Sequence, residues 1–433
     1  MSVCTQPSNP QHLHVMWKTV SEDCNLACDY CYYSTAGGIP NKPVRVMDTA
    51  LLERFMSEYM ERSSGQAAFF WQGGEPLLAG LPYFEKVISL QAKYAPPYTS
   101  ISNALQSNGT LINKEWAQFF KRYNFLIGVS LDGPESIHNA HRITGSGKGS
   151  FDLVMRGISL LQNADVEYNI LSVIHEDNVT NPDELMAFYQ EQKFAYIQFI
   201  PCMDFVSQKS GEPGRFRITP EQYGTFLCRT FDLWYNDGEP QLSIRIFDNM
   251  LLVFMHSQAE QCVHSSCCPK MMVLETNGDA YPCDFFIDEE HRLGNIGQTS
   301  LESLLANAVY DEFLQMKPRM NKACSDCQYV GLCHGGCPRN RNWLDVNDRS
   351  EVDYFCHSYK MFYAHAFERM NMLAIRLRGE RMLAYRRSGK PLPGRNEPCL
   401  CGSGKKFKNC CQPLCDVVDI CRQLLFQVIA TNY

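Results

Sequence analysis

The sequence predicts an α/β protein: a partial (β/α)6 barrel of the TIM type, followed by a cysteine-rich region and a small metal-binding module. Two observations predict the barrel. Short β-rich runs alternate with amphipathic helical stretches in the first half of the chain, and this alternation repeats six times. Strand–helix units in series give parallel strands with right-handed crossovers, which curl into a barrel or part of one. The expected strands are 14–19, 67–71, 101–107, 126–130, 167–173 and 196–200.

The expected helices lie between these strands. One begins after Asp48, a typical N-cap residue, and its Leu51, Phe55 and Tyr59 are spaced four residues apart, on one helix face. Others are expected at about 83–93 and after Asn113, Ser150, Pro182 and Pro220. In such folds ligands bind to the loops at the carboxyl ends of the strands, so we expect the chemistry there.

Length and composition limit the possible functions. The 433 residues suggest roughly three domains, and 45% hydrophobic against 20% charged residues exclude wholesale disorder. A net charge of −7 argues against binding nucleic acid through bulk charge. The N-terminal segment has no signal-peptide pattern, and no run approaches the roughly 18 apolar residues of a membrane span. We therefore expect a cytoplasmic protein that binds neither nucleic acid nor a membrane.

The sequence holds 21 cysteines, which in a long cytosolic chain indicate metal binding or catalysis more than disulfides. Cys24, Cys28 and Cys31 form a CxxxCxxC motif directly after the first strand. Three thiolates can bind three corners of a [4Fe–4S] cluster and leave one iron open. A zinc knuckle or three unrelated thiols are the alternatives, but structural zinc needs four ligands and no fourth Cys or His lies close by.

Two later strand ends also carry residues suited to binding. The second strand is followed by the stretch QGGEP, which is either a plain turn or a close approach of the backbone to a ligand. Ser130, His138 and Arg142 follow the fourth strand. A guanidinium group can bind a carboxylate through two hydrogen bonds, whereas His138 could equally be a solvated loop residue.

Two more cysteine groups follow. Eight cysteines between residues 262 and 356 include the spacings C-x9-G-x4-C and C-x2-C-x5-C-x3-C. They suffice for two [4Fe–4S] clusters or two zinc ions, and spacing alone does not choose. Cys267 beside Cys268 makes one ligand ambiguous, and the spacing from Gly278 favours Cys268. Four further cysteines form C-x-C-x8-C-C and suit a tetrahedral structural zinc, which would supply the fold of so small a module. These four are Cys399, Cys401, Cys410 and Cys411.

The CxxxCxxC motif, with Tyr30 before its last cysteine, resembles the signature of the radical S-adenosylmethionine (SAM) enzymes. The resemblance implies that SAM binds the open iron and is cleaved to a 5′-deoxyadenosyl radical. The implied SAM-binding residues are Tyr30, Gly73, Gly74, Glu75, Ser130 and Arg142.

The eight-cysteine group resembles the SPASM extension of such enzymes, which implies two auxiliary [4Fe–4S] clusters for electron transfer and three clusters in all. The nearer auxiliary cluster would be held by Cys262, Cys268, Cys283 and Cys337. The farther one would be held by Cys324, Cys327, Cys333 and Cys356. The last four cysteines resemble the SEC-C module, which implies Zn2+ there. Its lysine-rich face either docks a protein or is simply solvated.

Residues 10 to 375 resemble most the anaerobic sulfatase-maturating enzymes, through the stretches QGGEP, SNGT, SLDGP, HRITGSGKGSFD, FIPC and CDFF. The resemblance implies oxidation of a Cys or Ser in a C/S-x-P/A-x-R segment of a sulfatase to Cα-formylglycine. It also implies Asp284 as the catalytic base, Tyr33 and Gln72 as substrate contacts, and an electron donor such as a flavodoxin or ferredoxin. The alternatives are a SPASM enzyme that crosslinks peptides and a non-catalytic, zinc-rich adaptor protein.

The expected domains follow from these motifs. They are a barrel at 1–240, a SPASM domain at 241–375, a basic linker at 376–395, a SEC-C zinc module at 396–412 and a tail at 413–433.

Overall fold

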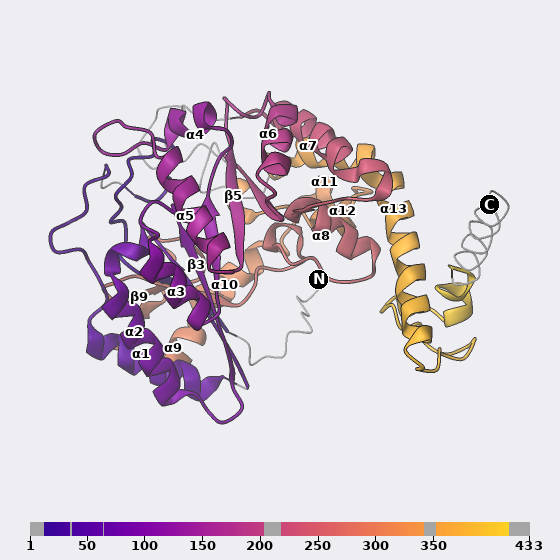
Figure 1. Ribbon diagram of the computed structural model, residues 1–433. Helices are drawn as coiled ribbons and strands as arrows, with labels where there is room; N and C mark the ends of the chain where they lie inside the picture. The colour runs from indigo at the N-terminus through magenta and orange to yellow at the C-terminus, as the bar shows by residue number, and fades with distance from the viewer. Residues whose placement is uncertain (1–12, 35–36, 64, 203–217, 342–351, 415–433) are drawn as a thin grey trace.

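The computed structural model of the chain describes residues 13–34, 37–63, 65–202, 218–341 and 352–414. These residues form a ten-stranded sheet in the order β10-β9-β8-β1-β2-β3-β4-β5-β6-β7 (Figure 1). The first six strands are neighbours in chain order and run parallel, while β10 and β7 form the two edges. The predicted partial barrel is therefore confirmed. Its strands are β1 (His14–Lys18), β2 (Gln66–Gln72), β3 (Ser100–Ser107), β4 (Phe125–Ser130), β5 (Tyr168–Ile174) and β6 (Tyr196–Pro201).

The predicted helices between these strands are also present. Their N-termini are fixed by side chains: Asp48 accepts from the backbone N–H of Ala50, and Asn113 from that of Trp116, both at 2.9 Å. A short helix around His138 was not expected from the sequence. The elements are α1 (Thr49–Arg62), η1 (Pro76–Ala79), α2 (Leu81–Tyr94), α3 (Lys114–Arg122), α4 (Glu135–His141), α5 (Phe151–Asn163), α6 (Pro182–Glu191) and α7 (Pro220–Tyr235).

Aromatic side chains fill the core between the sheet and these helices. The ring of Trp17 on β1 lies 5.1 Å from Phe55 on α1, and Trp71 on β2 lies 5.5 Å from Phe84 on α2, each edge to face. These four side chains are buried. The core therefore forms behind the sheet, and it leaves the carboxyl ends of the strands available to the loops that carry the sequence motifs.

The cysteine-rich region contributes strands to the same sheet. Its strand β8 pairs in parallel with β1, with His14 opposite Met271. Sequence periodicity missed β8, β9 and β10 because they have only two to four residues and no helix separates them. The elements are η3 (Asn236–Gly238), β7 (Ser243–Ile244), α8 (Arg245–Phe254), η4 (Cys262–His264), β8 (Met271–Leu274), β9 (Asp279–Tyr281), β10 (Gly294–Asn295), α9 (Leu301–Leu305), α10 (Ala308–Met316), α11 (Lys322–Ser325), α12 (Val330–Cys333) and η5 (Pro338–Asn340).

Helix α13 (Cys356–Arg387) corrects the expectation of a linker at 376–395. Its first part packs against α7 and α8, and its second part extends to the C-terminal module (Figure 1). The stretch 376–387 is rich in Arg, Leu, Met and Ala, which favour helix. The helix ends where Gly389, Pro391 and Pro393 follow, so only 388–395 is non-helical.

The C-terminal module includes a short helical turn, η6 (Phe407–Asn409). Phe407 and the module's buried cysteines pack against Met382 and Leu383 of α13, so the module rests on the end of that helix. The tail from 415 onwards lies outside the described residues. Among the described residues, no helix is both long enough and apolar enough to cross a membrane.

The packing of α7 on α13 gives a test of the fold. A Cβ placed on Gly224 of α7 would lie 2.7 Å from Met361 Sδ and 3.1 Å from Ser358 Cα. Gly224→Ala gains about 1 kcal/mol in helix propensity, but overpacking costs roughly 1–3 kcal/mol. We therefore expect a lower midpoint of thermal unfolding, measured by circular dichroism.

Gly331→Ala is the matched control, because a Cβ on Gly331 of helix α12 would have no neighbour within 4 Å. Its midpoint should equal or exceed that of the wild type. If Gly224→Ala were as stable as the control, the proposed tight α7–α13 contact would be wrong.

Candidate active site and metal centres

The three cysteines of the CxxxCxxC motif lie together in the loop after β1. Burial raises the pKa of the Cys28 thiol to about 12, Arg142 lowers it, and the neighbouring Cys31 and Cys24 raise it, so the three sulfurs are within electrostatic reach. Cys24 Sγ accepts from the Leu26 N–H at 3.4 Å and from Asn108 Nδ2 at 3.8 Å. Such N–H donors to sulfur are a usual feature of iron–sulfur sites. The donor set fits a [4Fe–4S] cluster held by three thiolates.

The glycine pair after β2 holds this loop in place. A Cβ on Gly74 would lie 1.8 Å from the carbonyl oxygen of Asp23, so only glycine permits this contact. The same carbonyl accepts from the Glu75 N–H at 2.8 Å. The sequence predicted a close approach of the backbone at these glycines. Among the described residues, the backbone here approaches the cysteine loop.

Glu75 links the end of β2 to the end of β3 through hydrogen bonds. Its carboxylate accepts from Ser107 Oγ at 2.9 Å and from the backbone N–H of Asn108 at 2.7 Å, both at the end of β3. Burial raises its pKa to about 7, although these hydrogen bonds lower it. Asn108 in turn reaches the Cys24 sulfur. The conformation of the cysteine loop thus depends on both β2 and β3.

Arg142 is paired with a carboxylate that sequence reasoning did not single out. Its Nε and Nη2 donate to the two oxygens of Asp132 at 2.8 and 3.1 Å, and Tyr30 donates its hydroxyl to the same carboxylate. Burial raises the pKa of Asp132, but Arg142 outweighs it and brings the pKa to about 2. Ser130, also predicted to bind SAM, accepts from Gln106 Nε2 at 3.0 Å.

The structure corrects the expectation that His138 is a solvated loop residue. It is fully buried in α4, where its ring Nε2 lies 2.9 Å from Ser150 Oγ and its Nδ1 accepts from the Asp132 N–H. Burial lowers its pKa to about 4. His138 therefore helps to hold the Asp132 loop, and it is not a solvated loop residue.

Asp284 and the predicted substrate contacts Tyr33 and Gln72 meet at the carboxyl ends of β1 and β2. They are joined by Lys18, the last residue of β1, which forms an ion pair with Asp284 and donates to Gln72 Oε1 at 3.3 Å. Its ammonium nitrogen lies 4.1 Å from the centre of the Tyr33 ring. Three residues predicted from separate motifs thus share one polar cluster.

Sequence reasoning missed three members of this cluster. Besides Lys18, Tyr32 donates to Asp284 Oδ2 at 2.5 Å, and Glu275, at the end of β8, accepts from the Tyr33 hydroxyl at 2.5 Å. Lys18 could have been found from its position, because a charged residue at the end of a buried strand is rarely left unpaired. Nothing in the local sequence points to Glu275, whose partners are more than 240 residues away.

The nearer auxiliary set of cysteines is brought together by distant segments. Burial raises the pKa of Cys268 to about 12, Lys317 lowers it, and Cys337 and Cys262 raise it. Burial raises the pKa of Cys283, and Cys337 and Cys262 raise it further. Cys268 therefore lies within electrostatic reach of Cys262 and Cys337, and its role as the ligand stays a prediction.

The farther auxiliary set lines one small pocket. Tyr359, Tyr363 and Lys360 of α13 form part of its wall. The four thiols predicted for one cluster are thus gathered around one hollow, which suits a [4Fe–4S] cube. They are Cys324, Cys327, Cys333 and Cys356.

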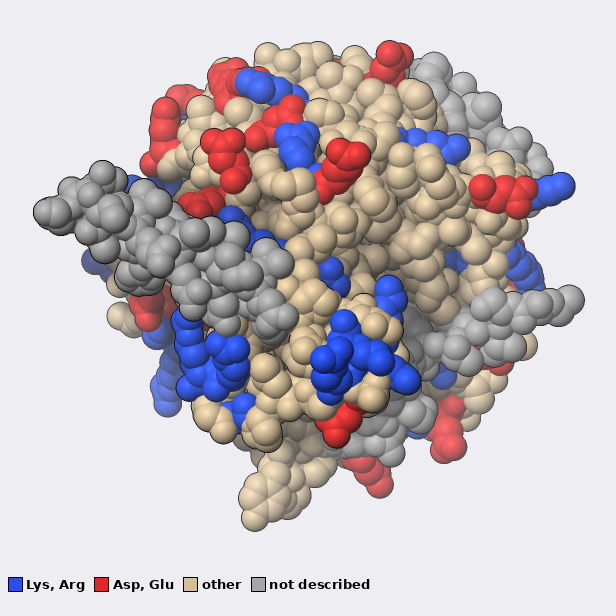
Figure 2. Space-filling view, turned by 90° about the vertical axis from the view of Figure 1, so that its right-hand side faces the viewer, with Lys and Arg blue, Asp and Glu red and all other residues tan. Residues whose placement is uncertain are grey.

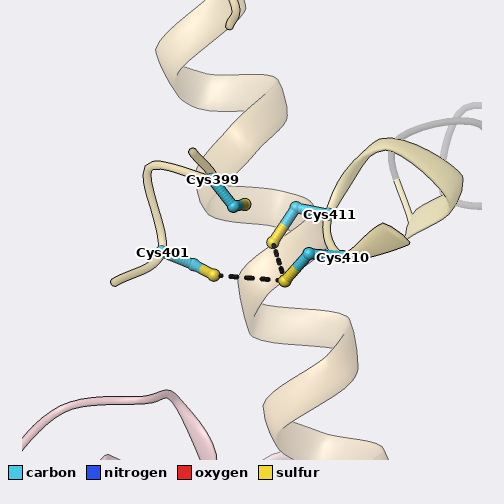
Figure 3. Close-up of side chains that lie close together, drawn as sticks. All are labelled: Cys399, Cys401, Cys410 and Cys411. Atoms are coloured by element: carbon cyan, nitrogen blue, oxygen red, sulfur yellow. Dashed lines mark hydrogen bonds between the residues drawn. The ribbon is translucent and has the colours of Figure 1, made fainter. Parts of the chain in front are cut away.

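The four cysteines of the C-terminal module form a separate centre (Figure 3). Their sulfur atoms all lie within 4.8 Å of one another. Cys410 Sγ is 3.4 Å from Cys401 Sγ and 3.8 Å from Cys411 Sγ. A tetrahedral zinc with Zn–S bonds of about 2.3 Å requires sulfurs about 3.8 Å apart, so the donor set fits this metal.

Comparison with known proteins agrees with this geometry. Family models match as the radical SAM superfamily at residues 19–189, the iron–sulfur cluster-binding SPASM domain at 267–328 and the SEC-C motif at 395–413. The chain is 35% identical to the cysteine-type anaerobic sulfatase-maturating enzyme of Clostridium perfringens, over 83% of this chain and 97% of that one. It is also 35% identical to the serine-type enzyme of Bacteroides thetaiotaomicron, over 86% and 94% of the two chains.

Solved structures give the same result. The structure of native anSMEcpe with bound AdoMet superposes with a TM-score of 0.79 at 34% identity, covering 84% of this chain and 99% of that one. Its complex with AdoMet and the Cp18Cys peptide superposes with a TM-score of 0.78. From its motifs, its fold and these relatives, the chain belongs to the anaerobic sulfatase-maturating enzymes and is a radical SAM oxidoreductase.

Proposed function

We propose that this enzyme converts a Cys or Ser of a sulfatase, within a C/S-x-P/A-x-R segment, to Cα-formylglycine. The observation that carries the proposal is the meeting of Asp284, Gln72 and Tyr33 next to Cys283, a ligand of the nearer auxiliary set. The alternative of a crosslinking SPASM enzyme is not favoured, because relatives with a third of their residues identical are sulfatase-maturating enzymes of the cysteine and serine types. An assay with paired Cys and Ser peptides tests the proposal.

The chemistry follows from the atoms that the substrate loses. Conversion of a –CH2–SH group to a thioaldehyde removes one hydrogen atom, one proton and one electron, and hydrolysis then gives the aldehyde and H2S. SAM bound at the three-cysteine cluster would supply the radical that takes the hydrogen atom. Asp284 takes the proton. A serine side chain loses the same hydrogen atom, proton and electron and gives the aldehyde directly.

We propose three [4Fe–4S] clusters. The auxiliary sets have four cysteines each, so clusters there would have no open iron and would supply an electron acceptor and a path to an external flavodoxin or ferredoxin. We further propose that SAM is held by the six residues predicted from the sequence, from Tyr30 to Arg142. Because thiols stay reduced in the cytoplasm, we place the reaction there.

Asp284→Asn tests the proposed base. The amide keeps the shape of the side chain but accepts a proton poorly, and loss of a general base typically costs about 100-fold or more. We expect formylglycine formation to fall by that factor while release of 5′-deoxyadenosine stays measurable, with both followed by mass spectrometry. Asp288→Asn, four residues along the chain and paired with His291, is the control, and wild-type yield from Asp284→Asn would remove this residue from the mechanism.

We also propose that the C-terminal module binds one zinc ion and docks a protein with an acidic surface. Residues 376–414 hold ten basic and two acidic side chains, whereas the whole chain has a net charge of −7. Figure 2 shows Lys and Arg side chains gathered in patches on the face that carries the module. Lys405 and Lys406 are exposed there. The basic charge therefore lies where a partner can reach it.

Metal analysis tests the assignment of the sites. Protein purified without oxygen should hold about twelve irons, by four per cluster, and one zinc. Replacing both Cys410 and Cys411 by Ser should remove the zinc and leave iron content and activity on a short peptide unchanged. If the iron content fell with the zinc, the module would not be the independent zinc site proposed here.

The docking role requires a separate test, because a short peptide does not need it. A triple variant with Gln in place of Lys405, Lys406 and Lys408 should turn over a short peptide as the wild type does. It should lower the formylglycine content of a full-length sulfatase made in the same cell. The control replaces Lys93, Lys121 and Lys193 by Gln, far from the module in the sequence. Equal maturation by the two triple variants would mean that the basic face is merely solvated.

A further inference from the structure

The removal of a hydrogen atom, a proton and an electron from the substrate does not itself use the buried ammonium group of Lys18. Lys18 is only 1% exposed, although it carries a charge, and burial of an ammonium group is costly unless it is paired. The neighbours of its nitrogen are Asp284, the amide oxygen of Gln72 and the faces of the Tyr32 and Tyr33 rings. All four are placed in the proposed substrate site. We propose that Lys18 is a positioning residue that fixes the Asp284 carboxylate for proton removal, an inference that rests on the proposed function.

The backbone is arranged to bring Lys18 to this place. Strand β1 lies between β2 and β8, so its last residue reaches both the barrel and the auxiliary-cluster region. In the β1–β2 ladder Lys18 stands opposite Gln72. A Cβ on Gly73 would lie 3.0 Å from both Cα and Cδ of Lys18. The glycine of the QGGEP stretch thus leaves room for the lysine side chain.

The contacts determine the orientation of the carboxylate. One oxygen of Asp284, Oδ1, forms the ion pair with Lys18, and the other, Oδ2, accepts from the Tyr32 hydroxyl. A carboxylate has about four lone-pair positions, so a position on each oxygen remains for a substrate proton. Asp284 itself belongs to the loop between the short strands β9 and β10. Lys18 and Tyr32 therefore hold it from the barrel side.

The link to Gln72 gives Lys18 a second function. Gln72 is a proposed substrate contact, and its amide oxygen is held by the same nitrogen that pairs with Asp284. One group thus sets the position of the base relative to a residue that contacts the substrate. A misplacement of about 1 Å between reacting groups can cost on the order of 100-fold in rate, so we expect loss of Lys18 to resemble loss of the base.

The test uses Lys18→Met, which keeps the length of the side chain and removes its charge. Enzyme with full iron content is assayed without oxygen with SAM, a reductant and a sulfatase-motif peptide whose substrate cysteine carries two deuterium atoms on Cβ. Deuterium transfer to 5′-deoxyadenosine should stay within about twofold of wild type, while aldehyde formed per 5′-deoxyadenosine falls by about tenfold or more. The loss should appear in kcat more than in KM.

A double variant distinguishes positioning from an independent effect. Lys18→Met added to Asp284→Asn should cause little further loss, because residues that act as a unit are not additive. Thr19→Val is the matched control: Thr19 is the buried next residue, and its hydroxyl donates to the Trp17 carbonyl outside the cluster. Its ratio of aldehyde to 5′-deoxyadenosine should equal that of wild type.

If Lys18→Met formed as much aldehyde per 5′-deoxyadenosine as the wild type, Lys18 would not be a positioning residue. The same conclusion would follow if the losses of the two single variants multiplied in the double variant. If Lys18→Met failed to retain iron, Lys18→Gln would be measured in the same way, and the same ratio would decide. A wild-type enzyme that released 5′-deoxyadenosine but no aldehyde would overturn the proposed function itself, and the role of Lys18 with it.

Discussion

The structure depends on the position of β1 between two parallel partners, β2 and β8. On one side this pairing places the three-cysteine loop against the QGGEP turn, where Gly74 allows the backbone of Asp23 to approach. On the other side it brings in the segment that carries Cys283 and Asp284, more than 250 residues later in the sequence. Parallel strands end at the same edge of a sheet, so both sets of residues reach the same place. The barrel and the auxiliary-cluster region therefore share one site.

Charges at this edge are buried in pairs that connect separate segments. Arg142 with Asp132 links α4 to the loop after β4, and Lys18 with Asp284 links β1 to the loop after β9. Removing one partner of such a pair leaves an uncompensated buried charge and typically costs about 3–5 kcal/mol. A hydrophobic pair would hold the same segments together as well or better. The charges are thus better explained by chemistry at the site than by stability.

The sequence predicted what local patterns determine. The six βα units follow from alternating periodicity, and helix starts follow from N-cap residues such as Asp48 and Asn113, because these signals lie within a few residues of their effect. The sets of cysteines that the structure brings together were grouped from spacing and family resemblance, and their role as metal ligands stays a prediction. The strands β8 to β10 were missed because they are too short to show a period, and they form only through pairing with β1 and with one another. Lys18 and Glu275 were missed because their partners are distant in the sequence.

Helix α13 separates the C-terminal module from the cluster sites. The helix begins at Cys356, in the wall of the pocket lined by the farther auxiliary set, and its far end packs against the C-terminal module through Met382 and Leu383. Thirty-two residues at 1.5 Å each span about 48 Å. Charges separated by several times the Debye length of about 8 Å interact little through solvent. The module therefore acts through what it binds, and its packing on the end of α13 fixes its basic charge relative to the enzyme.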